Sequence, residues 1–153
     1  MRIKTTSLFC AVVMALATMA PVWAASPQPA DQQASLYKRL GGYDALAAVT
    51  DDFLGRMATD PQLARFFKGH NTESLKGIRQ HIIDFLCVAT GGPCAYTGRD
   101  MKTAHTGLGI TEDDWTASVK DLNATFDKFK VPDKERQDVL AAVSGLKGDI
   151  VGH

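Results

Sequence analysis

Four histidines are the side chains in this sequence best suited to bind a metal: His70, His81, His105 and His153. His105 precedes Gly107 and Gly109, and glycines let a backbone pass close to a bulky group. His81 lies about 60° from Ile78 on a helical wheel, at the flank of an apolar stripe. Taken alone, the residues favour a surface histidine at 105 and a hydrogen-bonded, core-edge histidine at 81.

Other common chemistries find no support in the sequence. There is no HExxH or cysteine–histidine spacing typical of zinc, no GxSxG, no phosphate-binding or dinucleotide fingerprint, and no CxxCH for covalent c-type haem. What remains is a pair of histidines among helices and an ample supply of large apolar side chains. These could line an apolar slot for a flat cofactor: Phe53, Phe66, Phe67, Phe85 and Trp115.

Net charge and length narrow the class of protein. Lysine plus arginine and aspartate plus glutamate both number 17, so no basic excess points to nucleic acid. The 153 residues favour one domain of ordinary globular composition.

The N-terminus has the layout of a secretory signal peptide. Arg2 and Lys4 precede an apolar run from Leu8 to Met19, and a small-residue site ends at Ala24. The alternative, a transmembrane anchor, needs about 20 apolar residues, and the run is shorter. We expect a signal peptide over 1–24, a flexible tether over 25–34 and a globular domain over 35–152. The mature chain would be exported, in the periplasm, without membrane attachment.

Apolar spacing predicts an all-α fold of five substantial helices. Residues 73–90 carry apolar side chains on more than one face, so this helix is expected to be buried. Thr111 and Asp114 resemble a capping box. The expected elements are helices at 35–40, 44–58, 73–90, 112–130 and 133–150, a short turn at 60–67 with Pro61 in first position, and a short helix before His105.

Two cysteines remain after the signal peptide, Cys87 and Cys94, with a chain reversal between them. Export and the turn favour a disulfide. The alternative is one buried thiol and one loop thiol.

A set of motifs, in order along the chain, resembles the group 1 truncated haemoglobins. The resemblance runs from Leu36 to Val151. It implies a two-over-two helical sandwich around haem b. The motifs are LYKRLGG, DDF at 51–53, DPQLARFF at 60–67, LKG at 75–77, GGP at 91–93 and YTGRDMKTAH at 96–105.

The resemblance implies a role for each matching residue on the proximal side. His105 matches the histidine that ligates haem iron, and Phe67 matches the phenylalanine that packs on the haem face. Tyr96 and Met101 match residues of the haem-contacting loop and short helix. Lys102 is placed to reach a propionate.

On the distal side the sequence departs from the best-known family pattern. Leu54 stands where many members have tyrosine, and Ile78 and Ile82 stand where members often have glutamine. His81 matches the distal histidine of cyanobacterial-type members, which can bind iron as a sixth ligand. Two alternatives stay open: His81 donates a hydrogen bond to bound gas, or His81 binds the iron, which we favour for the protein without ligand.

The leading functional hypothesis is reversible binding of oxygen, nitric oxide and carbon monoxide, as in oxygen transport, without catalysis. The alternatives are nitric oxide dioxygenation or peroxidase-like activity, and exported electron transfer or redox sensing. Leu54 argues against efficient dioxygenation. Turnover would also need a separate electron donor, since no reductase domain is evident. The oligomeric state stays open.

Overall fold

The computed structural model describes residues 34–153, and all regular structure in this range is helical. The predicted signal peptide and all of the predicted tether except Ala34 lie outside the described residues. The all-α prediction is confirmed. The elements are α2 (Leu36–Arg39), α3 (Gly42–Thr59), the 3-10 helix η1 (Ala64–Phe67), α4 (Thr72–Ala89), α5 (Met101–His105), α6 (Glu112–Phe129), α7 (Asp133–Ser144) and α8 (Lys147–Ile150).

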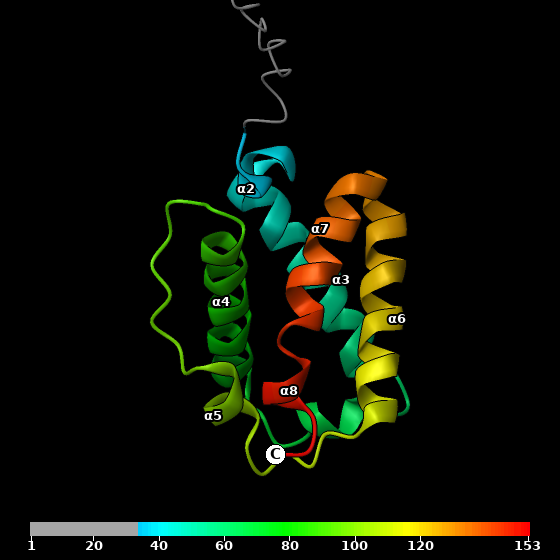
Figure 1. Cartoon of the computed structure of the whole chain (residues 1–153). Coiled ribbons are helices and arrows are strands. Elements are labelled where there is room, and N and C mark those ends of the chain that lie inside the picture. The colour runs from blue at the N-terminus through cyan, green and yellow to red at the C-terminus, as the bar shows by residue number, and fades with distance from the viewer. Residues whose placement is uncertain (1–33) are drawn as a thin grey trace, which may run out of the picture.

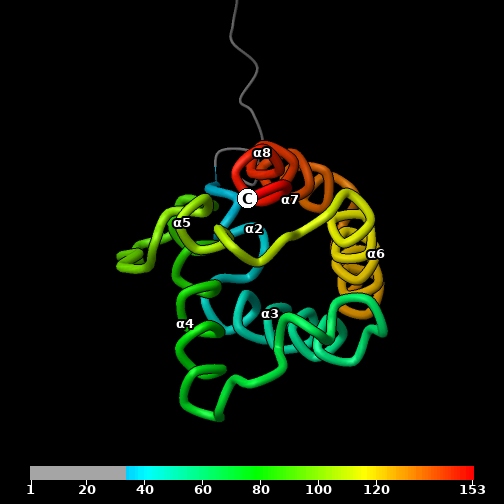
Figure 2. The backbone as a smooth tube through the Cα atoms, turned by 90° about the horizontal axis from the view of Figure 1, so that it is seen from below, coloured from blue at the N-terminus to red at the C-terminus, as the bar shows by residue number. Residues whose placement is uncertain are grey.

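The long helices form two layers around a common core. Figure 2 shows α4 and α6 on opposite sides of the molecule, with α3 along one edge and α7 with α8 along the other. α3 packs against both α4 and α6. Leu122 and Phe126 of α6 meet Val139 of α7 in the core, where Val49 and Phe53 of α3 also pack. This is the predicted two-over-two sandwich (Figure 1).

Side chains at the starts of the helices explain where several of them begin. Ser35, Asn71, Asp100 and Thr111 each accept a backbone N–H from the first turn that follows. Such a bond satisfies a donor that has no partner within the helix. At α6 the predicted capping box is confirmed, with reciprocal bonds between Thr111 and Asp114.

Two predicted boundaries were wrong. The helix predicted over 133–150 is two helices, because the chain turns at Gly145 and glycine is a poor helix former. Gly42 begins α3 rather than ending the helix before it, and Gly41 is its left-handed cap with φ 97°. The prediction for Pro61 is confirmed: it is the first residue of the turn before η1, where the Asp60 carboxylate accepts the N–H groups of Gln62 and Leu63.

α4 is less buried than its apolar faces suggested. Ile83 and Cys87 are fully buried, but Leu75 is 38% exposed and Val88 is 45% exposed. The reason is that α4 packs mainly against α3, so only one of its faces reaches the core. None of the helices described over 34–153 is long and apolar enough to span a bilayer.

The predicted disulfide between Cys87 and Cys94 is confirmed, with 5.9 Å between the two Cα atoms. It joins the end of α4 to the segment that leads to α5. Gly92 lies inside the loop that the disulfide closes, and a Cβ there would lie 2.6 Å from the sulfur of Cys87. A larger residue would therefore displace the disulfide or the turn.

Asp52 of α3 joins the two layers through hydrogen bonds. It accepts them from Lys128 and Thr125 of α6 and from Arg56 of its own helix. The hydrogen bond from Lys128, followed by those from Arg56 and Thr125, lowers the pKa of the Asp52 carboxyl from 3.8 to about 2, against the opposing effect of burial. A carboxyl whose pKa is lower in the folded state than in the unfolded state stabilises the fold at pH values above its unfolded pKa. That contribution is lost as the pH falls toward the folded pKa.

The Asp52→Asn variant is therefore expected to be less stable at pH 7, by an amount on the order of 2 kcal/mol. The difference from the parent should shrink as pH falls from about 4 toward 2, and urea unfolding at several pH values measures it. Asp51→Asn is the matched control, because Asp51 pairs with Arg79 at the surface and its loss should cost under about 1 kcal/mol. A pH-independent difference between Asp52→Asn and the parent would contradict this account.

Candidate functional site

His105 is the last residue of α5, not a residue after the short helix as predicted. α5 begins at Asp100, whose carboxylate accepts the N–H of Thr103 at 2.8 Å. The backbone N–H of Thr103, followed by its hydroxyl, holds the pKa of Asp100 below its ordinary value. The cap therefore fixes the start of the five-residue helix that carries His105.

One ring nitrogen of His105 makes a hydrogen bond within α5. Nδ1 lies 2.7 Å from the carbonyl oxygen of Met101, one turn earlier on α5, and the ring is half-buried. A carbonyl can only accept, so Nδ1 carries the proton and donates it. In the neutral ring Nε2 is then the nitrogen without a proton, and a neutral imidazole is the form that binds a metal.

The C-terminal residues hold the loop that follows His105. The N–H of Gly109 donates to the carbonyl of His153 at 3.3 Å, and the N–H of Gly152 donates to the carbonyl of Ile110 at 3.0 Å. α8 also contacts α5, and Figures 1 and 2 both show the C-terminus beside α8. The sequence carried no signal of this pairing, because terminal residues usually fray.

Three of the predicted distal residues share one face of α4 with Phe85. Ile78, His81, Ile82 and Phe85 follow helical spacing of three and four residues, which places them side by side. The three apolar members are only half-buried, and His81 is exposed. This face differs from the one that carries the fully buried Ile83 and Cys87.

Tyr96, from the segment before α5, covers part of this face. Its ring meets the ring of Phe85 edge-on at 5.4 Å between centroids, and the ring of His81 at 6.2 Å. The structure thus brings together the predicted haem-loop residue Tyr96, the predicted distal residue His81 and Phe85, which was predicted to line the cofactor slot. No pattern in the sequence indicated that Tyr96 contacts His81.

The two phenylalanines of η1 are held in place from α6. Arg65 lies over the ring of Phe66 at 4.3 Å and pairs with the buried carboxylate of Asp114, which also accepts from Gln62. Burial would raise the pKa of Asp114, but hydrogen bonds from Thr111, Arg65 and Gln62 outweigh it and hold the pKa well below its usual range. These contacts fix η1, and with it the half-buried Phe66 and Phe67, against the start of α6.

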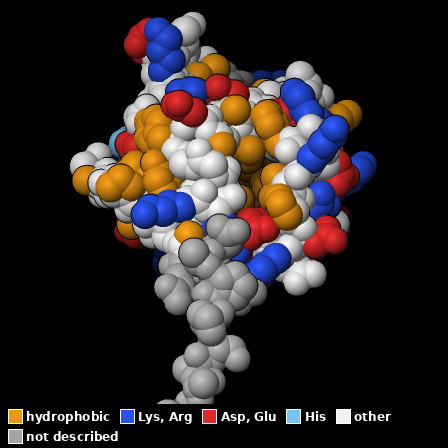
Figure 3. Space-filling view, turned by 90° about the horizontal axis from the view of Figure 1, so that it is seen from above, with side chains coloured by type: hydrophobic (Ala, Val, Ile, Leu, Met, Phe, Trp, Pro, Cys, Tyr) orange, Lys and Arg blue, Asp and Glu red, His pale blue; other side chains and the backbone are white. Residues whose placement is uncertain are grey.

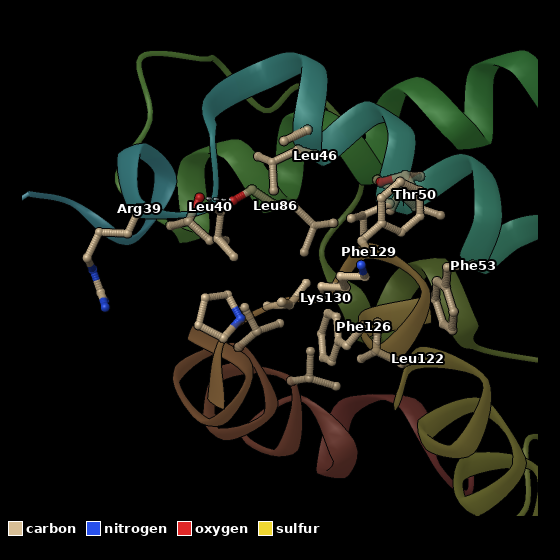
Figure 4. Close-up of a pocket in the computed structure, with 18 of the residues that line it drawn as sticks. Arg39, Leu40, Leu46, Thr50, Phe53, Leu86, Leu122, Phe126, Phe129 and Lys130 are labelled. Carbon is tan, nitrogen blue, oxygen red and sulfur yellow. Dashed lines mark hydrogen bonds between the residues drawn. The ribbon is translucent and has the colours of Figure 1, made fainter. Parts of the chain in front are cut away.

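An apolar cavity of about 270 Å³ lies between the two layers (Figure 4). Two predicted site residues line it, Phe53 and Ile82, while neither His105 nor His81 does. The hydroxyl of Thr50, 1% exposed, also lines it and has no hydrogen-bond partner among the described residues. The cavity therefore borders the distal face of α4 but does not contain the histidines.

The remaining predicted residues lie on three different elements. Leu54 is half-buried on α3, Trp115 is half-buried in the first turn of α6, and Lys102 is exposed on α5. Figure 3 shows the end of the molecule opposite to the one that faces the viewer in Figure 2. There, apolar side chains surround a hollow, and charged side chains lie at its rim. Lys130 and Pro132, which line the cavity, are also exposed to water.

These residues fit a haem group. His105 offers an unprotonated Nε2, and the half-buried apolar face of α4 offers a surface that a large flat apolar ligand can cover. Lys102 is exposed on α5, and its ammonium group is suited to pair with a propionate carboxylate of haem at the protein surface. Fold and residues together define an all-α globin of the two-over-two type.

Comparison with known proteins gives the family. A model of the bacterial-like globin family matches residues 35–151. The chain is 36% identical over 119 residues to a group 1 truncated haemoglobin of Mycolicibacterium paratuberculosis, covering 78% of this chain and 85% of that protein. It is 33% identical to a group 1 truncated haemoglobin of Nostoc commune over 76% of this chain and 97% of the other. The chain belongs to the bacterial-like globin family, as a group 1 truncated haemoglobin.

Solved structures agree with this assignment. The truncated haemoglobin of Tetrahymena pyriformis, in its Fe(III) form, superposes with a TM-score of 0.72 at 26% identity. The 2/2 haemoglobin of a Synechococcus species, with covalently attached haem, superposes with a TM-score of 0.71 at 28% identity. Each comparison covers 78% of this chain and 100% of the other. The predicted family and fold are confirmed, and members of this family are haem-binding globins that bind gases.

Proposed function

We propose that this chain holds haem b through His105 and reversibly binds oxygen, nitric oxide and carbon monoxide, with His81 as the sixth iron ligand when no gas is bound. The observation that carries the proposal is the hydrogen bond from Nδ1 of His105 to the carbonyl of Met101, which leaves Nε2 free. Family membership supports it, and so does the haem named for the Synechococcus relative.

Haem supplies the iron atom at which a diatomic gas binds. On the proximal side, His105 would hold this iron through Nε2. The bond to the Met101 carbonyl fixes the tautomer and the ring orientation, and a hydrogen-bonded imidazole is a more basic ligand. The Asp100 cap and the pairing with the C-terminal residues hold α5 and its loop, so His105 would be held in place as a ligand.

On the distal side, His81 is the sole polar group among the four residues that share the α4 face. Leu54, Ile78 and Ile82 offer no hydrogen bond, so a bound gas would meet an otherwise apolar surface. His81 is exposed, so its ring can turn toward or away from that surface without breaking a hydrogen bond among the described residues. These properties suit a ligand that binds iron and yields to a gas.

Apart from Lys102, the other contacts proposed for haem are apolar. They come from α3, η1, α4, α5 and α6 and include the edge of the Tyr96 ring, while Lys102 pairs with a propionate. The full set is Phe53, Leu54, Phe66, Phe67, Ile78, Ile82, Phe85, Tyr96, Met101, Lys102 and Trp115.

Gas titration tests the proposal. The reduced protein is expected to take up one equivalent of carbon monoxide, and to take up oxygen and release it again under vacuum, as followed by absorbance. An apolar pocket that excludes water favours this reversibility, because it slows oxidation of the iron. Rapid oxidation by oxygen with no reversible uptake would contradict the proposal and favour electron transfer or redox sensing.

We further propose export of the chain with removal of residues 1–24, because residues 1–24 have the three-part layout of a signal peptide. The mature domain would then lie in a compartment that permits the Cys87–Cys94 disulfide. The mass of the protein recovered from a periplasmic fraction tests this, and a full-length chain confined to the cytoplasm would contradict it.

A further inference from the structure

We propose that Tyr96 is a positioning residue for His81, and that the Cys87–Cys94 disulfide holds Tyr96 in that place. This inference rests on the proposed function, since it concerns how readily His81 reaches the iron. Tyr96 would then orient His81 in addition to contacting the cofactor.

The ring of Tyr96 meets two neighbouring side chains of one α4 face. Its plane stands at 83° to the ring of His81 and at 74° to the ring of Phe85, which lies four residues later. Edge-to-face pairs of this kind are attractive, because the positive edge of one ring meets the negative face of the other. The Tyr96 ring is thus fixed by Phe85 and lies against His81.

His81 needs such a neighbour because it is exposed. An exposed side chain samples several rotamers, and binding to iron would require it to give up that freedom. The Tyr96 ring closes off part of the space on one side of His81. Restricting the unbound rotamers lowers the entropy lost on coordination, so Tyr96 favours the six-coordinate state.

The segment that carries Tyr96 has few supports of its own. Residues 93–99 contain no helix or strand, and no backbone hydrogen bond joins them to another residue that the structure describes. The Tyr96 hydroxyl donates to the carbonyl of Arg99, which closes a tight turn. Gly98 lies inside this turn, and a Cβ there would overlap the Tyr96 ring.

The disulfide supplies the missing support. Cys87 lies two residues after Phe85 on α4, and Cys94 lies two residues before Tyr96. The covalent link and the ring contacts therefore join the same two stretches of chain, side by side. Without the link, the segment 93–99 would depend on the Tyr96 contacts and on the start of α5 alone.

The Tyr96→Ala variant of the haem-loaded protein tests the positioning role. We expect the ratio of six-coordinate to five-coordinate protein to fall about threefold to tenfold, the range expected for loss of an aromatic pair. Low-spin and high-spin fractions in the ferric absorption and electron paramagnetic resonance spectra measure this ratio. Tyr96→Phe keeps both ring contacts and loses only the bond to Arg99, so its ratio should lie between those of the parent and Tyr96→Ala.

Two further variants act on the same contact without removing the ring. Gly98→Ala forces the Tyr96 ring to move, and the Cys87→Ser/Cys94→Ser pair frees the segment. Both should shift the ratio in the same direction as Tyr96→Ala. Tyr43→Ala is the matched control, since Tyr43 also contacts α4, through Gln80, but not at His81. It should leave the ratio unchanged.

A double-mutant cycle separates positioning from a general effect on folding. In a His81→Leu background, Tyr96→Ala should leave the iron five-coordinate and high-spin, because no sixth ligand remains for Tyr96 to position. An unchanged or increased six-coordinate ratio in Tyr96→Ala, Gly98→Ala and the serine pair would overturn the inference. If His81→Leu itself left the spectrum unchanged, the proposed sixth ligand would fail, which is a separate outcome from failure of the Tyr96 role.

Discussion

The His105→Gly variant is expected to lose haem during purification, with affinity reduced by at least about a hundredfold. The protein would lose its proximal iron ligand and the orientation that Met101 gives to it. Free imidazole should restore haem binding, because it can occupy the space of the missing ring. Absorbance of haem per protein, with and without imidazole, measures the effect.

His70→Gly provides the control for this variant. His70 is also a histidine near the end of a helix, but it is exposed and its ring pairs with the hydroxyl of Ser74 at 2.8 Å. Haem content should stay as in the parent. If His105→Gly kept full haem content and an unchanged ferrous spectrum, His105 would not be the proximal ligand.

The His81→Leu variant is expected to be five-coordinate when no gas is bound. Its affinity for carbon monoxide should rise, by about a hundredfold if only ~1% of the parent protein is free of the His81 ligand at any time. The physical reason is that an internal ligand competes with gas for the same position. Stopped-flow mixing and equilibrium titration with carbon monoxide measure the change.

The direction of the change in oxygen affinity distinguishes the two roles left open for His81. Loss of a competing iron ligand raises oxygen affinity. Loss of a hydrogen bond worth about 0.5–1.5 kcal/mol would instead lower it, by roughly twofold to tenfold. Gln80→Leu is the matched control, because Gln80 is the exposed neighbour of His81 and lies off the face shared with Ile78 and Ile82. It should leave both affinities unchanged.

The helical architecture could be predicted from the sequence where local chemistry determines it. The cap at Ser35, the capping box at Thr111 and the apolar spacing of α6 depend on residues close together in the chain. The exposure of α4 could not be predicted in the same way. It depends on which faces of the helix find a partner in the folded molecule.

In the candidate site, too, some features could be predicted from the sequence and others depend on the folded structure. Composition and spacing left His105 as a surface histidine, and its proposed role came from the resemblance to a family. The structure adds the carbonyl of Met101, which explains why Nε2 is available, and the ring of Tyr96 beside His81. A bond from the second nitrogen of His105 to a carbonyl was expected, because metal-binding histidines usually make one, but the sequence did not say which carbonyl accepts it. The contact of Tyr96 with His81 could not be predicted, because Tyr96 reaches His81 only through the turn closed by the disulfide.

The central claim is that His105 and His81 together hold haem iron, and the absorption spectrum of the purified protein tests it most directly. Oxidised and reduced forms should both show haem absorbance with the bands of six-coordinate, low-spin iron. The reduced form of His81→Leu should change to five-coordinate, high-spin iron. Absence of haem absorbance after haem supplementation, or a reduced spectrum that is five-coordinate in the parent and identical in His81→Leu, would contradict the claim.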